Sequence, residues 1–219
     1  MIVICLEGCH GCGKTQLTQQ FESAGFKTLD EAFLTMPSAK IGPQSLLMET
    51  QWVCSWFLRL LNLVDDKQKE GDKATAGLDE VYVCDRSPFS AVCYSNRGGV
   101  SSGHLLEEVI REHIREVREA AGIEVYTVHV SVDPDKLWSR IQGRLQLYPE
   151  RKLLKEDKRE HMTKITDFYE GFKWDARVDN SEDDDGHGAA KMIMQKMAAL
   201  SDKYKRVASM KAEKRDRSL

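Results

Sequence analysis

The feature of this sequence that most constrains its fold is an apolar run followed directly by a glycine-rich loop. Residues 2–6 are all apolar, and residues 8–15 fit the pattern G-x-x-x-x-G-K-[ST]. The loop consists of Gly8, Cys9, His10, Gly11, Cys12, Gly13, Lys14 and Thr15. Glycines let successive backbone N–H groups point inward and form a nest for an anion, and the helix that follows adds its positive dipole end. We expect this loop to bind nucleotide phosphates, with Lys14 on the outer phosphates and the Thr15 hydroxyl on Mg²⁺.

Cys9 and Cys12 also form a C-x-x-C pair, which allows two other interpretations. A thioredoxin-like redox pair likewise follows a strand and precedes a helix, and half of a zinc site has the same spacing. The sequence contains no second cysteine pair at zinc-finger spacing, and both cysteines occupy variable positions of the phosphate-binding pattern. We therefore interpret them as small side chains in a tight loop.

The length and composition of the chain indicate one intracellular domain. With 219 residues, 41% of them hydrophobic, the chain can bury one full core, so we expect a single domain over residues 1–205 and a basic, disordered tail at 206–219. A formal net charge of -3 gives no bulk attraction to nucleic acid or membrane, and we expect neither as a partner. Six cysteines in mostly apolar or loop contexts are typical of a reducing, cytoplasmic location. No apolar stretch is long enough for a signal peptide or a membrane span.

Strand-like apolar runs alternate with segments of helical periodicity along the chain. The strand-like runs are residues 2–6, 26–29, 81–84, 125–132 and 176–179. Such alternation predicts βαβ units, and therefore an α/β fold of three layers (α/β/α) around a central five-stranded parallel sheet. Ligands bind beyond the carboxyl ends of the strands in such sheets, so the residues just after each strand are the candidates for a site.

Two carboxylates follow strand-like runs. Asp85 closes the third run, and a carboxylate at that place in a phosphate-loop protein holds Mg²⁺ or its waters. An N-cap for the helix that begins near Pro88 is the structural alternative, but the strand-end position favours the metal role. Glu31 follows the second run, and the residues alone leave it open between a functional carboxylate and a solvated loop residue.

A basic segment after the fourth strand-like run is the candidate for a lid. Arg140 and Arg144 lie four residues apart, on one helix face, and Arg151 follows. Arginine forks suit phosphate oxygens, so we expect Arg140 and Arg144 to neutralise a phosphoryl group in transfer. A mobile segment over about residues 140–156 would also exclude water from the site. Most other charges here are expected to form an ordinary solvated helix face.

In their order and spacing these motifs resemble the deoxynucleoside kinases and, more broadly, the deoxynucleoside/thymidylate kinase branch of the phosphate-loop kinases. The matches are the loop at 8–15, Glu31, Gln51, the segment Asp85-Arg86-Ser87-Pro88-Phe89-Ser90-Ala91, the arginines Arg140 and Arg144, and Val178-Asp179-Asn180. The motifs are short, but together they cover essentially the whole chain. The resemblance implies a P-loop kinase fold that uses ATP and Mg²⁺, with Asp179 in the loop that holds the adenine.

The resemblance also implies roles for residues on the acceptor side. Glu31 would act as general base on a nucleoside 5′-hydroxyl, and Gln51 would pair with the base edge. Arg86 would clamp the acceptor oxygen or a phosphate. Trp52 and Phe89 are candidates for stacking on the base, although aromatic residues at helical spacing are more often part of the core.

Departures from the family pattern leave the acceptor open. Asp85 stands where the deoxynucleoside kinases have Glu, and Asp-Arg is instead the thymidylate kinase pattern. However, residues 30–33 replace the Arg-Glu-Pro-Gly-Gly-like segment typical of thymidylate kinases. We expect transfer of the ATP γ-phosphoryl group to a deoxynucleoside, with a dTMP kinase as the closest alternative and a non-catalytic nucleotide-binding switch as a more distant one. The resemblance further implies a homodimer, through helices around residues 52–64 and 104–121.

Overall fold

The computed structural model describes residues 1–30, 45–69, 80–94, 103–182 and 185–216. Its sheet consists of β1 (Ile2–Glu7), β2 (Lys27–Leu29), β3 (Val81–Asp85), β4 (Glu124–Ser131) and β5 (Ala176–Asp179). These strands pair in the order β2-β3-β1-β4-β5, and every pairing is parallel. The predicted five-stranded parallel sheet is therefore confirmed. β1 occupies its centre, and every residue of β1 is buried because neighbouring strands and helices cover it on all sides.

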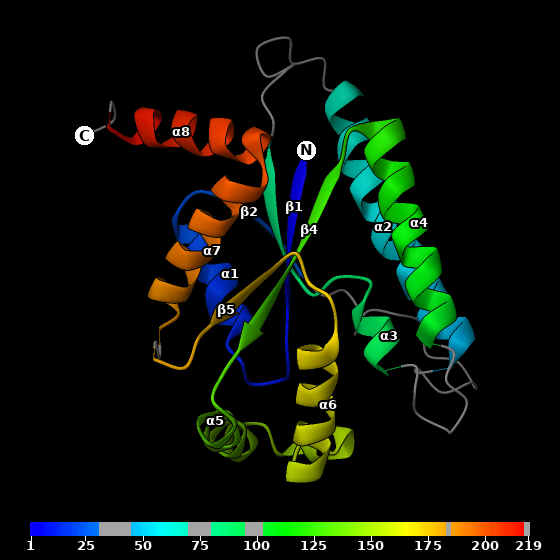
Figure 1. The fold of residues 1–219 in the computed structure, drawn as a ribbon, viewed down its shortest axis with the longest axis vertical. Helices are drawn as coiled ribbons and strands as arrows, with labels where there is room; N and C mark the ends of the chain where they lie inside the picture. The colour runs from blue at the N-terminus through cyan, green and yellow to red at the C-terminus, as the bar shows by residue number, and fades with distance from the viewer. Residues whose placement is uncertain (31–44, 70–79, 95–102, 183–184, 217–219) are drawn as a thin grey trace.

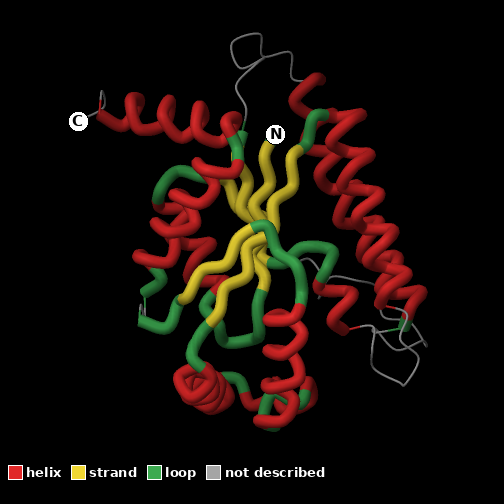
Figure 2. The backbone as a smooth tube through the Cα atoms, viewed as in Figure 1, coloured by secondary structure: helices red, strands yellow, loops and turns green. Residues whose placement is uncertain are grey.

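Helices cover both faces of this sheet. They are α1 (Lys14–Ser23), α2 (Leu46–Lys69), α3 (Ser90–Tyr94), α4 (Gly103–Ala121), α5 (Pro134–Leu147), the 3₁₀ helix η1 (Pro149–Leu154), α6 (Arg159–Gly171), α7 (His187–Leu200) and α8 (Asp202–Asp216). Figure 1 shows α2 and α4 on one side of the strands and α1 and α7 on the other, which confirms the three-layer α/β/α architecture. The tube in Figure 2 shows α5 and α6 beyond the carboxyl ends of the strands. That end of the sheet is where a ligand is expected.

Amphipathic helices fix the layers to the sheet. Leu17 and Phe21 of α1 lie four residues apart, share one helix face, and are both fully buried. Ile110 of α4 is fully buried on the opposite side of the sheet, and Ile193 of α7 on the same side as α1. Burial of each such side chain stabilises the fold by roughly 1.5–3 kcal/mol. These contacts therefore fix α1 against the sheet, and with it the position of the loop between β1 and α1.

The C-terminal segment differs from the sequence-based prediction. Residues 206–219 were expected to be disordered, but α8 continues as a helix through Asp216. Ser201 interrupts the preceding helix, and its hydroxyl accepts the backbone N–H of Tyr204 as an N-cap does. Tyr204 and Val207 are buried, and the Tyr204 ring stacks on Phe26. Because Lys, Arg, Ala and Met favour helices, this packed first turn is enough to continue the helix.

The single-domain boundary at residue 205 stays a prediction, although α8 carries the helical structure past it. Of the helices described, none is both long enough and apolar enough to cross a membrane.

Candidate functional site

Two glycines of the phosphate loop hold conformations that other residues rarely adopt. Gly8 has φ 149° and Gly13 has φ 97°. A Cβ on Gly8 would lie 2.5 Å from the Val130 carbonyl oxygen, and one on Gly13 would lie 2.6 Å from the Asn180 amide nitrogen. The loop therefore packs closely against the end of β4 on one side and against Asn180, which follows β5, on the other. Neither glycine has room for a side chain.

The Lys14 side chain lies inside the loop that it follows. Its Nζ donates to the carbonyl oxygens of Gly8 (2.9 Å) and Cys9 (3.2 Å) and lies 3.6 Å from the Cys12 Sγ. The side chain is buried, so this ammonium group is drawn back against the loop. An anion in the nest would give it a partner of opposite charge in place of neutral carbonyl groups.

Thr15 and Asp85 come together at the carboxyl ends of β1 and β3. The Thr15 hydroxyl donates to Asp85 Oδ2 over 3.3 Å. The other oxygen, Oδ1, is buried and has no hydrogen-bond partner within the part of the chain that the structure describes. Hydroxyl and carboxylate oxygens are ligands that suit Mg²⁺. In that same part of the chain no group of three His, Cys, Asp or Glu residues could hold a metal alone, so phosphate and water would have to complete the coordination.

A buried carboxylate that the sequence analysis missed organises the floor of the site. Glu7, the last residue of β1, is fully buried and lies directly before the loop. Its Oε1 accepts the Ser87 N–H (2.7 Å) and the Ser87 hydroxyl (2.6 Å). Its Oε2 accepts the hydroxyls of Ser90 (2.9 Å) and Tyr169 (3.0 Å). Through these hydrogen bonds Glu7 connects β1 to three other parts of the chain: the segment that follows β3, helix α3 and helix α6. A charged residue that ends an otherwise apolar central strand is the sequence signal that could have revealed it.

The same network holds Arg86, the residue predicted to clamp the acceptor. Its backbone has φ 74°, in the left-handed region, while its N–H donates to the Leu6 carbonyl over 3.0 Å. The buried guanidinium donates to the Ser90 hydroxyl (3.3 Å) and the Tyr169 hydroxyl (3.2 Å). Arg86 is thus turned into the protein in this conformation, and its predicted contact with an acceptor would require new hydrogen bonds.

The predicted lid, residues 140–156, consists of the end of α5 and all of η1. Arg140 donates to the Asn180 carbonyl over 3.1 Å, and Arg151 forms a two-point pair with the buried Glu156 at 2.8 and 2.7 Å. Arg144 is half-buried and forms no hydrogen bond or ion pair with any residue that the structure describes. Burial and the neighbouring charge of Arg151 lower its pKa. Of these three arginines, Arg144 is the one with no hydrogen bond or ion pair among the described residues, and Glu156 and Asp85 attract its charge through Coulombic interaction alone.

The residues predicted to bind the acceptor are less clearly placed for that role than the residues predicted to bind phosphate and Mg²⁺. Glu31 lies outside the described residues. Gln51 is exposed on α2, where a ligand could reach it. Trp52 and Phe89 are 3% and 4% exposed, and Phe89 packs on Phe172. Both rings belong to the hydrophobic core, which is the alternative that their spacing also allowed, and their stacking on a base stays a prediction.

After β5, the residue that contacts the loop is not the one predicted to bind ATP. Asp179 is exposed, and its carboxylate accepts the N–H of Ser181 over 2.9 Å in a tight turn. The next residue, Asn180, is buried, and its amide donates to the Cys12 carbonyl over 2.9 Å. The turn at Asp179 therefore presents Asn180 to the loop. Whether Asp179 binds ATP stays a prediction.

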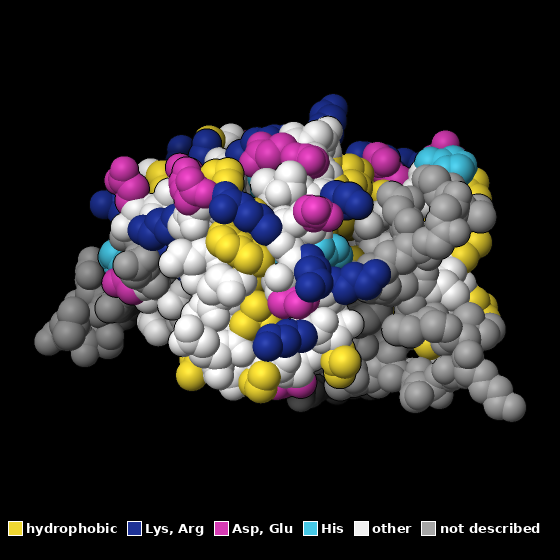
Figure 3. Space-filling view, turned by 90° about the horizontal axis from the view of Figure 1, so that it is seen from below, with side chains coloured by type: hydrophobic (Ala, Val, Ile, Leu, Met, Phe, Trp, Pro, Cys, Tyr) yellow, Lys and Arg dark blue, Asp and Glu magenta, His cyan; other side chains and the backbone are white. Residues whose placement is uncertain are grey.

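Seen from the carboxyl ends of the strands, the surface carries several basic side chains gathered around a histidine (Figure 3).

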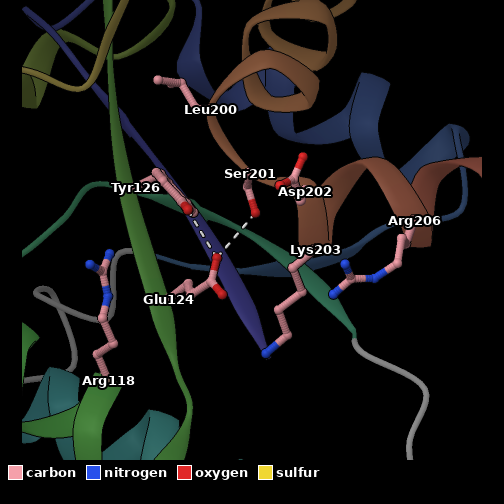
Figure 4. A pocket seen from close by; sticks show the side chains of 8 residues that line it. All are labelled: Arg118, Glu124, Tyr126, Leu200, Ser201, Asp202, Lys203 and Arg206. Atoms are coloured by element: carbon pink, nitrogen blue, oxygen red, sulfur yellow. Dashed lines mark hydrogen bonds between the residues drawn. The ribbon is translucent and has the colours of Figure 1, made fainter.

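A separate cavity of about 380 Å³ lies at the opposite end of the sheet. It is lined by Arg118, Glu124, Tyr126, Leu200, Ser201, Asp202, Lys203 and Arg206 (Figure 4). At its centre Glu124 accepts the hydroxyls of Tyr126 (2.9 Å) and Ser201 (3.1 Å). This mixed-charge cavity shares no residue with the phosphate-loop site.

The comparisons with known proteins agree with this geometry. A family profile described as an AAA domain matches residues 3–166 of the chain. The chain belongs to this AAA domain family. It is a nucleotide-binding P-loop domain, with its loop at the carboxyl end of β1.

One solved structure with a similar fold is the YorR protein from Bacillus subtilis in complex with phosphorylated GDP. YorR is 14% identical in sequence, with a TM-score of 0.51, and the match covers 91% of this chain and 98% of the YorR chain. At this identity the likeness supports the fold alone. The comparison with curated proteins found no match.

Proposed function

We propose that this AAA domain is an ATP- and Mg²⁺-dependent kinase that transfers the γ-phosphoryl group to the 5′-hydroxyl of a deoxynucleoside. The observation that carries the proposal is the Thr15–Asp85 contact beside Lys14, in which one buried carboxylate oxygen has no partner among the described residues. A hydroxyl, a carboxylate and a lysine at the end of a phosphate loop are the groups that place Mg²⁺ and a triphosphate. The half-buried Arg144 supplies a further positive charge.

Each residue then has a definite task. The loop amides and Lys14 bind the phosphates, while Thr15 and Asp85 hold Mg²⁺, which when bound withdraws negative charge from the phosphate oxygens. Arg144 neutralises the charge that shifts between phosphates during transfer. Glu31 accepts the proton of the attacking hydroxyl, a role that comes from the resemblance to deoxynucleoside kinases.

A thymidylate kinase that converts dTMP to dTDP is the closest alternative, supported by the Asp85-Arg86 pair. A binding module that never transfers phosphate is the more distant one. Incubation with γ-labelled ATP, each deoxynucleoside in turn and then each monophosphate separates all three. We expect labelled nucleoside monophosphate as the product. Labelling of dTMP alone would favour the alternative, and ATP binding without any labelled product would refute a kinase.

Two variants connect that assay to the site. Asp85→Asn keeps the shape of the side chain but removes its charge, so we expect a higher Mg²⁺ requirement with little change in ATP affinity in the absence of metal. Glu31→Gln should reduce transfer by about 100-fold while ATP still binds, since a general base contributes roughly 10²–10⁴-fold. Normal turnover by Glu31→Gln would remove the proposed base.

We also propose that the AAA domain forms a homodimer through the outer layer made by α2 and α4. Leu58 of α2 and Leu105 and Val109 of α4 are 57%, 50% and 42% exposed. Exposed apolar side chains on one helical layer favour association with another surface. Light scattering at increasing protein concentration should give a dimer mass, and Leu58→Asp should shift it to the monomer.

The cysteines support the proposed reducing, cytoplasmic location. All six are free thiols in the structure, and four of them are buried. Thiols in buried positions persist unpaired where glutathione and thioredoxin keep them reduced.

A further inference from the structure

His10, the third residue of the phosphate loop, carries a polar atom that the proposed catalytic roles do not use. Its side chain is 5% exposed, and its ring stacks on that of His161, with centroids 5.8 Å apart and planes at 21°. Its Nδ1 lies 3.5 Å from the Cys9 Sγ. Its Nε2 is buried, and among the described residues it has no hydrogen-bond partner. A buried ring nitrogen without a partner is costly, and a bound ligand would relieve that cost.

The Cys9 thiol has two acceptors within reach, the His10 Nδ1 at 3.5 Å and the Met162 carbonyl oxygen at 4.0 Å. Burial raises the pKa of Cys9 to about 12, so this residue keeps its S–H. Burial, together with the positive charges of Lys14, His161 and Arg86, lowers the pKa of His10 to about 3, so the ring is neutral. A neutral ring has one N–H, and the tautomer with the proton on Nε2 leaves Nδ1 able to accept the Cys9 S–H, which is the nearer of the two contacts of that thiol. Nε2 is then a hydrogen-bond donor.

The charges around the ring indicate what this donor meets. Lys14 and Arg86 act on His10 from the loop and the end of β3, and Glu156, itself paired with Arg151, acts from the lid. A donor in a place where cations converge fits an anionic oxygen. Because Lys14, which is expected on the outer phosphates, and Glu156 of the predicted lid both act electrostatically on the ring, we assign the oxygen that Nε2 meets to the outermost phosphate.

We propose that His10 Nε2 donates a hydrogen bond to the terminal phosphate of the bound nucleoside triphosphate, and that this phosphate selects the tautomer in which Nδ1 accepts the Cys9 S–H. The proposal rests on the proposed binding of a triphosphate donor. It makes His10 a residue that distinguishes ATP from ADP, beyond the backbone contacts that the two nucleotides share.

Calorimetric titrations with ADP and with the non-hydrolysable β,γ-imido analogue of ATP test the proposal. His10→Phe keeps a ring against His161 but has no donor, and we expect it to bind the triphosphate analogue about 10-fold more weakly with ADP affinity unchanged. His10→Gln supplies an amide donor and should retain most of the affinity. His113→Phe, on α4 against Phe57, is the matched control and should bind both nucleotides as the unmodified protein does.

Equal losses for ADP and the triphosphate analogue would show that His10 only packs, and no loss for either would also overturn the proposal. If the unmodified protein binds no nucleotide, the proposed function fails as well; if it transfers phosphate normally and His10→Phe behaves the same, only this inference fails.

A measurement on the unmodified protein guards against a variant that does not fold. In long-range ¹H–¹⁵N spectra of protein with ¹⁵N-labelled histidine, Nε2 of His10 should carry the proton and shift with the triphosphate analogue but not with ADP. A proton on Nδ1 in the complex with the triphosphate analogue would refute the tautomer argument.

Discussion

Removal of the Glu7 carboxylate should destabilise the whole domain, although the residue lies outside every motif in the sequence. Glu7→Ala leaves four buried donors without their acceptor: the Ser87 N–H and the hydroxyls of Ser87, Ser90 and Tyr169. One hydrogen bond to a buried charged group contributes ~1.5–3 kcal/mol, but such values are not additive within one network. Each buried donor left without its acceptor costs ~1–3 kcal/mol, and because the four losses overlap within one network we expect a total of about 4 kcal/mol in the free energy of unfolding.

Urea denaturation followed by tryptophan fluorescence measures this loss. Trp174 reports on the region directly, because its ring lies 5.5 Å from that of Tyr169 and its Nε1 donates to the Tyr169 carbonyl. In thermal unfolding, about 4 kcal/mol corresponds to a decrease of ~8–16 °C in a domain of this size. Glu7→Gln preserves the shape and one acceptor oxygen, and it should lose only ~1–2 kcal/mol.

Two further variants make the test decisive. Glu22→Ala removes an exposed carboxylate on α1 and should change stability by less than ~0.5 kcal/mol. Tyr169→Phe removes one of the four donors and should cost about 1 kcal/mol, which remains measurable if Glu7→Ala does not fold. An unfolding midpoint for Glu7→Ala equal to that of Glu22→Ala would refute the idea that this network holds the floor of the site.

Three other predictions follow from the site and the core. Lys14→Ala should weaken ATP binding by about 100-fold in calorimetry, because the loss of one buried charged contact costs ~2–5 kcal/mol. Gly13→Ala should destabilise the domain by ~1–3 kcal/mol and weaken ATP binding, because the backbone φ of Gly13 is positive and the new Cβ would clash with Asn180. The control is Gly143→Ala on α5, where a Cβ meets no atom within 4 Å, and this variant should raise the melting temperature. Burial lowers the pKa of His129 to about 4, so the unfolded chain binds more protons between about pH 6.5 and 4 and stability falls as the pH falls through that window. In His129→Gln the urea midpoint should therefore change less between pH 7 and pH 5 than in the unmodified protein. An equal change in both proteins would show that His129 is not the source of this pH dependence.

The sheet could be predicted from sequence because its strands are continuous apolar runs separated by clear turn signals. β3 was expected at residues 81–84 and is found at Val81–Asp85; β5 was expected at 176–179 and is found there. The contact between Thr15 and Asp85 also follows from the sequence, since Asp85 ends β3, Thr15 lies in the first turn of the helix after β1 and its loop, and β1 and β3 lie side by side. Local pattern and a topological rule are sufficient for these features.

The features that were missed depend on contacts between distant parts of the chain. Glu7 meets Tyr169 across 162 positions, and neither residue belongs to a motif that spacing reveals. Residues 206–219 were expected to be disordered because their composition is basic, but α8 continues to Asp216 from the docked Tyr204, which stacks on Phe26. Trp52 was a candidate for stacking on a base although aromatic residues at helical spacing are more often part of the core, and it is buried in the core here. Periodicity detects a buried face, but it does not distinguish packing from binding.

The arrangement of the arginines suggests how binding and closure could be linked. Arg140 is bonded to the Asn180 carbonyl, Arg151 to Glu156, and Arg86 to hydroxyls of the Glu7 network, so each of these three already has a partner inside the protein. An anion bound in the loop would therefore act first on Arg144, which forms no hydrogen bond or ion pair with the described residues and is influenced by Glu156 and Asp85 through Coulombic attraction alone. Because Arg144 lies on α5 within the predicted lid, attraction to a bound phosphate would pull that helix toward the loop. The lid would then respond to a triphosphate through a single cation, while the partnered arginines preserve the shape of the site.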